Sequence, residues 1–147
     1  MVILDTNVVA EMMKAAPAPT VVSWLNGQEA SGLFLTAITL GEVGYGLRVM
    51  PQGKRRFQLE EGFERILAEG FAGRVLAFDE EAARHYGEVM GRRKEIGRPL
   101  SVLDGQIASI ARARGCMVAT RNVRDFSECG VEIINPFDPP DLRSDPS

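Results

Sequence analysis

Three carboxylates stand where the chain is expected to turn from a strand into a helix. Asp5 directly follows the apolar run 2–4, and Glu42 and Asp104 each lie three residues after a Thr or Ser. Each alone has a structural explanation. An Asp after a strand can begin a turn or cap a helix, and the spacing at Glu42 and Asp104 fits a helix capping box. Taken singly, each carboxylate is better explained as a cap than as a ligand.

Taken together, the three carboxylates indicate a cation site. All three would lie at helix N-termini, where the helix dipole and free N–H groups tolerate negative charge. If the fold brings them within ~4 Å of one another, each pair repels by about 4 kcal/mol at an effective dielectric constant of about 20. Such a cluster needs a cation. Oxygen ligands alone select a hard ion such as Mg²⁺ or Mn²⁺, which also binds phosphate oxygens and activates water.

Hydrophobic periodicity predicts the elements that position these residues. Strands are expected at 2–4, 33–36, 75–78, 116–119 and 131–134. Helices are expected after Asp5 with Thr6 or Asn7 as cap, after Pro17 and Pro19, at Thr39, beyond Gly53, at Asp79 and at Ser101. This alternation is typical of one α/β domain with a mostly parallel sheet. Ligands of such sheets bind beyond the carboxyl ends of the strands, where the strand order reverses, and both Asp5 and the segment 120–125 follow strands.

The helices that carry Glu42 and Asp104 each have an apolar face that we expect to be buried. The face of the first helix consists of Leu40, Val43, Leu47 and Met50. The face of the second consists of Leu103, Ile107, Ile110 and Ala111, and Gly115 ends that helix.

The composition is that of an ordinary globular protein. The 147 residues, 45% hydrophobic and 25% charged, predict one domain. No apolar run approaches the ~18 residues of a membrane span, and Asp5 interrupts the apolar core that a signal peptide needs. We therefore expect a cytoplasmic protein with no membrane partner. Four prolines from position 136 onward predict a flexible tail at 138–147, after a domain at 1–137.

The residue counts and the net charge limit which metal sites and which modes of nucleic-acid binding we expect. His85 is the only histidine, and Cys116 and Cys129 form no close pair, so a zinc site is not expected. Because the net charge is −3, bulk electrostatic attraction to nucleic acid is not predicted. Basic clusters remain at 54–56, at 92–94 and at Arg121 with Arg124, and each alone is more typical of a solvated surface.

Four short motifs resemble, in order and separation, those of PIN-domain nucleases. They are VILDTNV at 2–8, TLGE at 39–42, LD at 103–104 and ATRN at 119–122. The resemblance is closest to the bacterial toxin branch of VapC and FitB type, and it covers residues 1 to 137. It implies a single PIN domain with a five-stranded parallel sheet in the order 3-2-1-4-5. It also implies a homodimer and a divalent-metal-dependent endoribonuclease that is silenced by an antitoxin protein, with DNA contacted only through that antitoxin.

The resemblance also assigns roles to individual residues. Asp5 and Asp104 would bind Mg²⁺, or Mn²⁺ in its place, and Glu42 would complete the catalytic set. Thr6 and Asn7 would help to order the first carboxylate. Glu42 would either orient or deprotonate the water that attacks the RNA phosphodiester, or ligate the ion from a second side, and the sequence leaves both roles open.

The chain departs from the family pattern at one position. Many relatives have an aspartate where this chain has Asn122, and Asp125 follows three residues later. An amide can ligate a metal through its oxygen but supplies no negative charge, so a second ion would be held weakly unless Asp125 replaces the aspartate. Nearby, Arg121 or Arg124 could hold the scissile or a flanking phosphate.

Two other functions fit parts of the sequence. A PIN fold kept as a catalytically weak binding module, acting through its antitoxin and DNA complex, is favoured only by Asn122. A phosphatase or phospho-receiver that uses Asp5 as nucleophile would need a carboxylate at position 7, where Asn7 stands, or adjacent acidic residues near the first strand. The ribonuclease explains all three carboxylates, so it is the function that we expect.

Overall fold

The computed structural model describes residues 1–139 of the chain. Five short strands form one parallel sheet in the order β3-β2-β1-β4-β5. They are β1 Val2–Leu4, β2 Leu33–Thr36, β3 Val75–Leu76, β4 Met117–Ala119 and β5 Ile133–Ile134. The α/β class, the parallel sheet and the strand order expected above are confirmed. The expected tail lies outside the described residues from position 140 onward.

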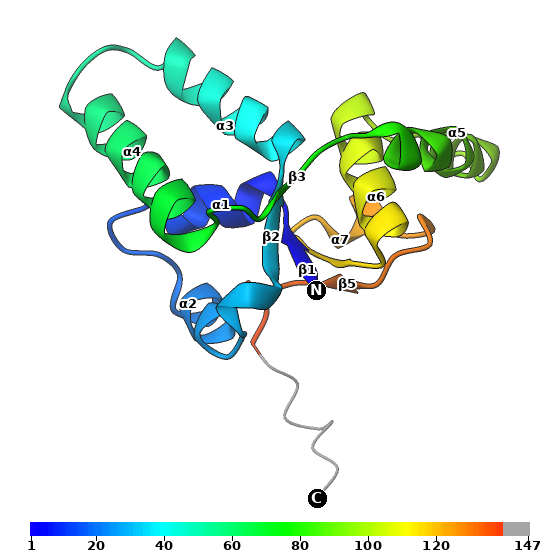
Figure 1. Ribbon diagram of the computed structural model, residues 1–147, viewed down its shortest axis with the longest axis horizontal. Coiled ribbons are helices and arrows are strands. Elements are labelled where there is room, and N and C mark those ends of the chain that lie inside the picture. Colours follow the sequence, from blue (N-terminus) through cyan, green and yellow to red (C-terminus); the bar gives the residue numbers. More distant parts are fainter. Residues whose placement is uncertain (140–147) are drawn as a thin grey trace, which may run out of the picture.

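Helices cover both faces of the sheet. On one side lie α1 to α4, and on the other lie α5 to α7 (Figure 1). The helices are α1 Thr6–Met12, α2 Pro19–Asn26, α3 Ala37–Val49, α4 Lys54–Arg65, α5 Glu80–Glu95, α6 Val102–Arg114 and α7 Val123–Phe126. A 3-10 turn, Ala30–Gly32, precedes β2, and a π-helical turn, Ile66–Gly70, continues α4. None of the helices within residues 1–139 is long and apolar enough to cross a membrane.

The core is divided by the sheet because successive strand residues point to opposite faces. Val2 and Leu4 of β1 pack in a cluster with residues of α1, α2 and α3, whereas Ile3 packs in a second cluster with residues of α5 and α6. Leu4 and Ile3 are fully buried. Burial on both faces explains why β1 is an uninterrupted apolar run rather than an alternating one.

The strand order reverses beside β1. From β1 the chain runs to β2 and β3 on one side and then returns to place β4 and β5 on the other. Leu4 pairs with Ala119, and the Asp5 N–H donates to the Ala119 carbonyl oxygen at 2.9 Å. Asp5 and Thr120 therefore leave neighbouring strands at the topological switch point, which is where open α/β sheets bind ligands.

Several element ends differ from the sequence predictions. Asp5, not Thr6 or Asn7, is the N-cap of α1. Helix α3 begins at Ala37 rather than Thr39, because the Thr36 hydroxyl accepts the Thr39 N–H at 3.1 Å and caps the helix. The third and fifth strands are two residues long, shorter than expected.

Two further differences concern α6 and the segment after β4. Leu103, expected on the buried face of α6, is 43% exposed and belongs to neither core cluster. The other three residues of that face are buried, and Gly115 ends the helix with a φ of 65°, as expected. The four-residue helix α7 was not predicted.

Candidate active site

Asp5 is a buried carboxylate held by three hydrogen bonds. Only 5% of the residue is exposed. Its Oδ1 accepts the Thr6 N–H at 2.8 Å, and its Oδ2 accepts the Thr120 hydroxyl at 2.8 Å and the Asn7 amide at 3.2 Å. The first contact is a helix cap, but the other two orient the carboxylate from α1 and from the end of β4. The structure thus places Asn7 in the supporting position that the resemblance implied.

The surroundings of Asp5 disfavour the ionised form of its carboxyl group. Burial raises its pKa from 3.8 to about 6, although the hydrogen bonds from Thr120 and Thr6 act in the opposite direction. The negative charges of Asp104 and Glu42 raise the pKa further. The fold therefore brings Asp104 and Glu42 near enough to Asp5 for their charges to act on it.

Glu42 is positioned through Thr6. The Thr6 hydroxyl donates to Glu42 Oε1 at 3.0 Å and lies 3.1 Å from the Thr39 hydroxyl, which joins α1 to α3. Because α3 begins at Ala37, Glu42 lies in the second turn of the helix and is not the acidic residue of a capping box. The capping explanation for Glu42 is therefore wrong, and a helix cap does not account for this carboxylate.

Asp104 lies in the first turn of α6 and keeps its capping contact. Its N–H donates to the hydroxyl of the N-cap residue Ser101 at 3.2 Å. Burial raises the pKa of the Asp104 carboxyl, and the Ser101 hydroxyl lowers it. The charge of Asp125 also raises this pKa, whereas that of Arg93 lowers it. Asp104 can both take part in the cap and serve in the site, because its capping hydrogen bond is made by its backbone N–H.

The segment after β4 contacts Asp5 through Thr120 and carries two of the predicted site residues, Asn122 and Asp125. Thr120 is fully buried, and its hydroxyl oxygen also accepts the Asn122 N–H at 3.0 Å. Asn122 is the exposed residue that precedes α7, and Asp125 is partly buried within that helix. Of the two candidates, Asp125 is the one whose charge acts on Asp104.

The two arginines suggested for RNA lie on the surface of this segment. Both Arg121 and Arg124 are exposed. The Arg121 guanidinium stacks 3.8 Å above the ring of Phe137, and its charge lowers the pKa of Glu11 in α1. The Arg124 carbonyl oxygen accepts a hydrogen bond from Arg93, so the backbone of α7 is fixed while the Arg124 side chain stays exposed.

Two buried residues near the predicted site residues, Thr120 and Arg93, were not singled out from the sequence. Thr120 was named only as part of a motif and of the segment 120–125. It directly follows β4, as Asp5 follows β1, and this position could have indicated that it lies near Asp5. Arg93 was placed in the solvated basic cluster 92–94, and this is wrong, because only 4% of Arg93 is exposed. No local pattern distinguishes Arg93 from its exposed neighbours Arg92 and Lys94.

The donor set fits a hard divalent cation held by few protein ligands. Burial raises the pKa of both Asp5 and Asp104, so a bound cation would stabilise their charged forms. Within residues 1–139, no three His, Cys, Asp or Glu side chains lie close enough to hold one ion together. This arrangement suits Mg²⁺, which usually keeps several water ligands and uses one or two carboxylates.

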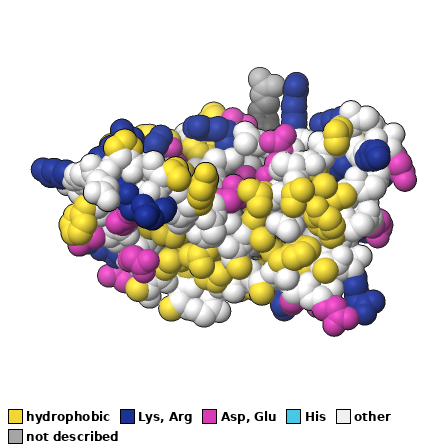
Figure 2. Space-filling model, turned by 90° about the horizontal axis from the view of Figure 1, so that it is seen from above, with side chains coloured by type: hydrophobic (Ala, Val, Ile, Leu, Met, Phe, Trp, Pro, Cys, Tyr) yellow, Lys and Arg dark blue, Asp and Glu magenta, His cyan; other side chains and the backbone are white. Residues whose placement is uncertain are grey.

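The site opens on the face formed by the carboxyl ends of the strands. Figure 2, which looks onto this face, shows acidic side chains near its middle and hydrophobic side chains gathered on either side. Exposed hydrophobic residues of this part of the molecule include Tyr45 and Val49 of α3 and Val102 and Leu103 of α6. The acidic centre is thus bordered by apolar surface.

A parallel α/β sheet with a buried aspartate at the strand-order reversal, on which the charges of two further carboxylates act, is the arrangement expected of a PIN domain. The chain belongs to the PIN domain family, whose model matches residues 2–131.

Within that family, the chain is similar to VapC and FitB proteins. It is 43% identical to VapC ribonuclease Y4jK of Sinorhizobium fredii over 139 residues, which are 95% of this chain and 99% of that protein. It is 35% identical to toxin FitB of Neisseria gonorrhoeae over 137 residues, 93% of this chain and 99% of that protein. The structure of FitAB bound to the IR36 DNA fragment matches with a TM-score of 0.88 and 34% identity, covering 97% of this chain and 99% of that one. The resemblance to the VapC and FitB branch is confirmed.

Proposed function

We propose that this chain is a divalent-metal-dependent endoribonuclease and the toxin of a toxin–antitoxin pair. The observation that carries the proposal is the buried Asp5 carboxylate at the switch point, on which the charges of Asp104 and Glu42 act and whose pKa is raised to about 6. Relatives named VapC ribonuclease and toxin FitB, similar over almost the whole chain, support both parts of the proposal.

The roles of the carboxylates follow from how each is held. Asp5 and Asp104 would bind Mg²⁺, or Mn²⁺ in its place. The ion, when bound, lowers the pKa of a water molecule and neutralises charge that develops on the phosphate. Within the described residues, Glu42 receives one hydrogen bond, from Thr6 to Oε1, so Oε2 is available to orient a water molecule or accept its proton.

The segment after β4 would complete the RNA side of the site. Asp125 acts on Asp104 electrostatically, and it is therefore a better candidate than Asn122 for the fourth acidic group. The exposed guanidinium of Arg121 or Arg124 would hold a phosphate of the RNA backbone, which suits a chain with a net charge of −3 and no bulk attraction for RNA.

The partner that we propose is an antitoxin protein that inserts a cationic side chain among the carboxylates. An Arg or Lys in this position would neutralise the repulsion that the metal otherwise relieves, and it would displace the metal. The structures of FitAB bound to DNA and of FitAcB are complexes that contain a related chain, and they support an antitoxin partner. A homodimer remains part of the proposal.

Cleavage of RNA by the partner-free protein tests the proposal. We expect single-stranded or loop RNA to be cut when Mg²⁺ or Mn²⁺ is present and to stay intact in excess EDTA. The Asp5→Asn variant, purified in the same way, should lose the activity, and this control excludes a contaminating nuclease. Equal cleavage with and without EDTA would overturn the metal assignment.

A further inference from the structure

Arg93 is a buried charge that forms no ion pair with a carboxylate among residues 1–139. It lies in α5 between the exposed Arg92 and Lys94, yet only 4% of it is exposed. None of the ion pairs formed among residues 1–139 includes it. Because an unpaired buried charge is costly, the guanidinium must be held by hydrogen bonds that an apolar side chain could not replace.

The guanidinium of Arg93 binds backbone carbonyl oxygens at the end of α7. Its Nη1 donates to the carbonyl oxygens of Arg124 at 3.2 Å, Asp125 at 3.2 Å and Ser127 at 2.7 Å. Its Nε donates to that of Arg98 at 2.6 Å. Helix α7 has four residues, too few for a stable helix on its own, and the last carbonyl groups of any helix lack partners within it. Arg93 supplies these partners and attaches α7 to α5.

Helix α5 is also fixed against the start of α6, beside Asp104. Gly105 packs so closely on α5 that an added Cβ would lie 2.4 Å from the Met90 Sδ. Met90 and Arg93 are three residues apart and therefore lie on one side of α5. The same surface of α5 thus contacts α6 next to Asp104 and contacts the α7 backbone at Asp125.

We propose that Arg93 is a positioning residue of the nuclease site, which holds α7 against α5 and so sets where Asp125 stands relative to Asp104. This inference rests on the proposed function, in which Asp104 binds the metal. A purely electrostatic role for Arg93 makes the opposite prediction for metal binding. Removal of a positive charge near two carboxylates would strengthen the binding of a cation, whereas loss of positioning weakens it.

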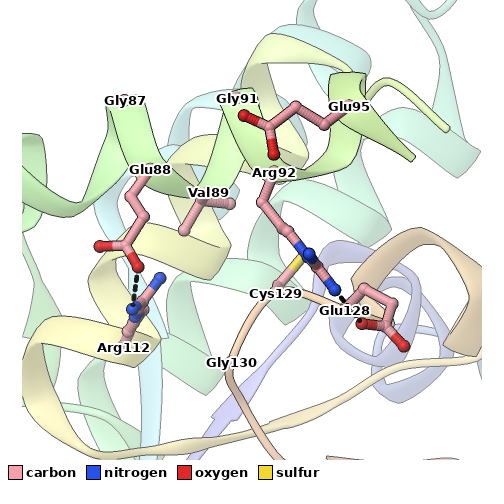
Figure 3. Close-up of a pocket in the computed structure, with 10 residues that line it drawn as sticks. All are labelled: Gly87, Glu88, Val89, Gly91, Arg92, Glu95, Arg112, Glu128, Cys129 and Gly130. Atoms are coloured by element: carbon pink, nitrogen blue, oxygen red, sulfur yellow. Dashed lines mark hydrogen bonds and ion pairs between the residues drawn. The ribbon is translucent and has the colours of Figure 1, made fainter. Parts of the chain in front are cut away.

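The neighbouring Arg92 provides a matched control. Figure 3 shows Arg92 reaching across a polar pocket to Glu128, with 3.4 Å between Arg92 Nη2 and Glu128 Oε2. Its side chain is 56% exposed. Arg92→Met therefore removes the same charge from the next position of the same helix without loss of a contact to α7.

The experiment compares Arg93→Lys, Arg93→Met, Arg92→Met and Asp125→Asn in the full chain. Mn²⁺ affinity is measured by titration calorimetry, and folding by circular dichroism. We expect Arg93→Met to bind Mn²⁺ about tenfold or more weakly than wild type, and Arg92→Met to bind it normally. Arg93→Lys keeps the charge but lacks the planar donor fork, so its affinity should fall as well. The double variant Arg93→Met with Asp125→Asn should bind no more weakly than Asp125→Asn alone.

Other results would overturn the inference. Unchanged or tighter Mn²⁺ binding by folded Arg93→Met shows that Arg93 does not position the site. If Arg93→Met does not fold, the inference is contradicted when folded Arg93→Lys binds Mn²⁺ with wild-type affinity. If neither variant folds, Arg93 is needed for the fold and is not assigned a positioning role. Wild-type protein that neither binds Mn²⁺ nor cleaves RNA contradicts the proposed function instead.

Discussion

Replacement of Asp5 by Asn should change how the stability of the metal-free protein depends on pH. The folded state raises the pKa of Asp5 from 3.8 to about 6, so between these values folded Asp5 holds a proton that the unfolded chain has released. A carboxyl group whose pKa is raised by folding lowers the free energy of unfolding as the pH rises. Wild-type protein in EDTA should therefore become less stable on going from acidic to neutral pH because of Asp5, and Asp5→Asn should lack this loss.

The magnitude follows from the pKa. One pKa unit corresponds to ~1.36 kcal/mol, so the ionisation of Asp5 costs the fold about 3 kcal/mol at neutral pH. Between about pH 4.5 and about pH 7.5 the loss is about 2 kcal/mol, because part of it has occurred at the lower pH. The lost hydrogen bonds of Asp5→Asn shift its stability at every pH, but they leave this pH-dependent difference unchanged. The pH dependence that Asp104 contributes is present in both proteins.

The assay is urea unfolding of both proteins in EDTA at the two pH values. The free energy of unfolding of wild type minus that of Asp5→Asn should fall by about 2 kcal/mol as the pH rises. Mg²⁺ at about a hundred times its dissociation constant should then stabilise wild type by about 2.7 kcal/mol, and Asp5→Asn much less. If the free energies of unfolding of the two proteins depend on pH in the same way, the pKa of Asp5 is not raised by folding.

Three further predictions concern Glu42, the segment after β4 and the partner. Thr6→Val removes the hydroxyl that donates to Glu42 but keeps the Thr6 N–H that donates to Asp5. RNA cleavage should therefore slow by about tenfold or more, while the Mn²⁺ affinity measured by calorimetry stays within about twofold. Asp125→Asn should reduce cleavage by about tenfold or more with little change in melting temperature, and Asn122→Asp should leave Mg²⁺ binding unchanged or tighter. A melting temperature that falls in Asp125→Asn, with activity retained, would assign Asp125 to the local fold. The antitoxin complex should bind little Mg²⁺ in a calorimetric titration, and full-strength binding by the complex would contradict cationic insertion.

The fold could be predicted because it depends on local signals, and the same signals supplied the residues that we propose for the site. The uninterrupted apolar run before Asp5 indicates a strand buried on both faces, and the alternation of strands and helices indicates a parallel sheet. In such a sheet, a carboxylate after the first strand lies where ligands bind. The four motifs then indicated the strand order and the partners of Asp5.

The missed features depend on contacts that no local pattern contains. Thr36 and Thr39 both have the side chain of a helix cap, and the end of β2 at Thr36 decides between them. That shift of the helix start by two residues moved Glu42 out of the capping position. Arg93 is buried by carbonyl groups 31 to 34 residues further along the chain, so its surroundings exist only after α5 and α7 have packed.

RNA cleavage by Asp104→Asn tests the central claim most directly. Wild type, Asp104→Asn and the control Glu88→Gln, whose carboxylate pairs with Arg112 outside the site, are compared on one RNA across a range of Mg²⁺ concentrations. We predict that wild type and Glu88→Gln cleave the RNA to the same extent with the same Mg²⁺ dependence, and that folded Asp104→Asn cleaves it at least about a hundredfold more slowly. Wild-type cleavage by folded Asp104→Asn would contradict the assignment of the Asp5 and Asp104 pair as the metal-dependent ribonuclease site.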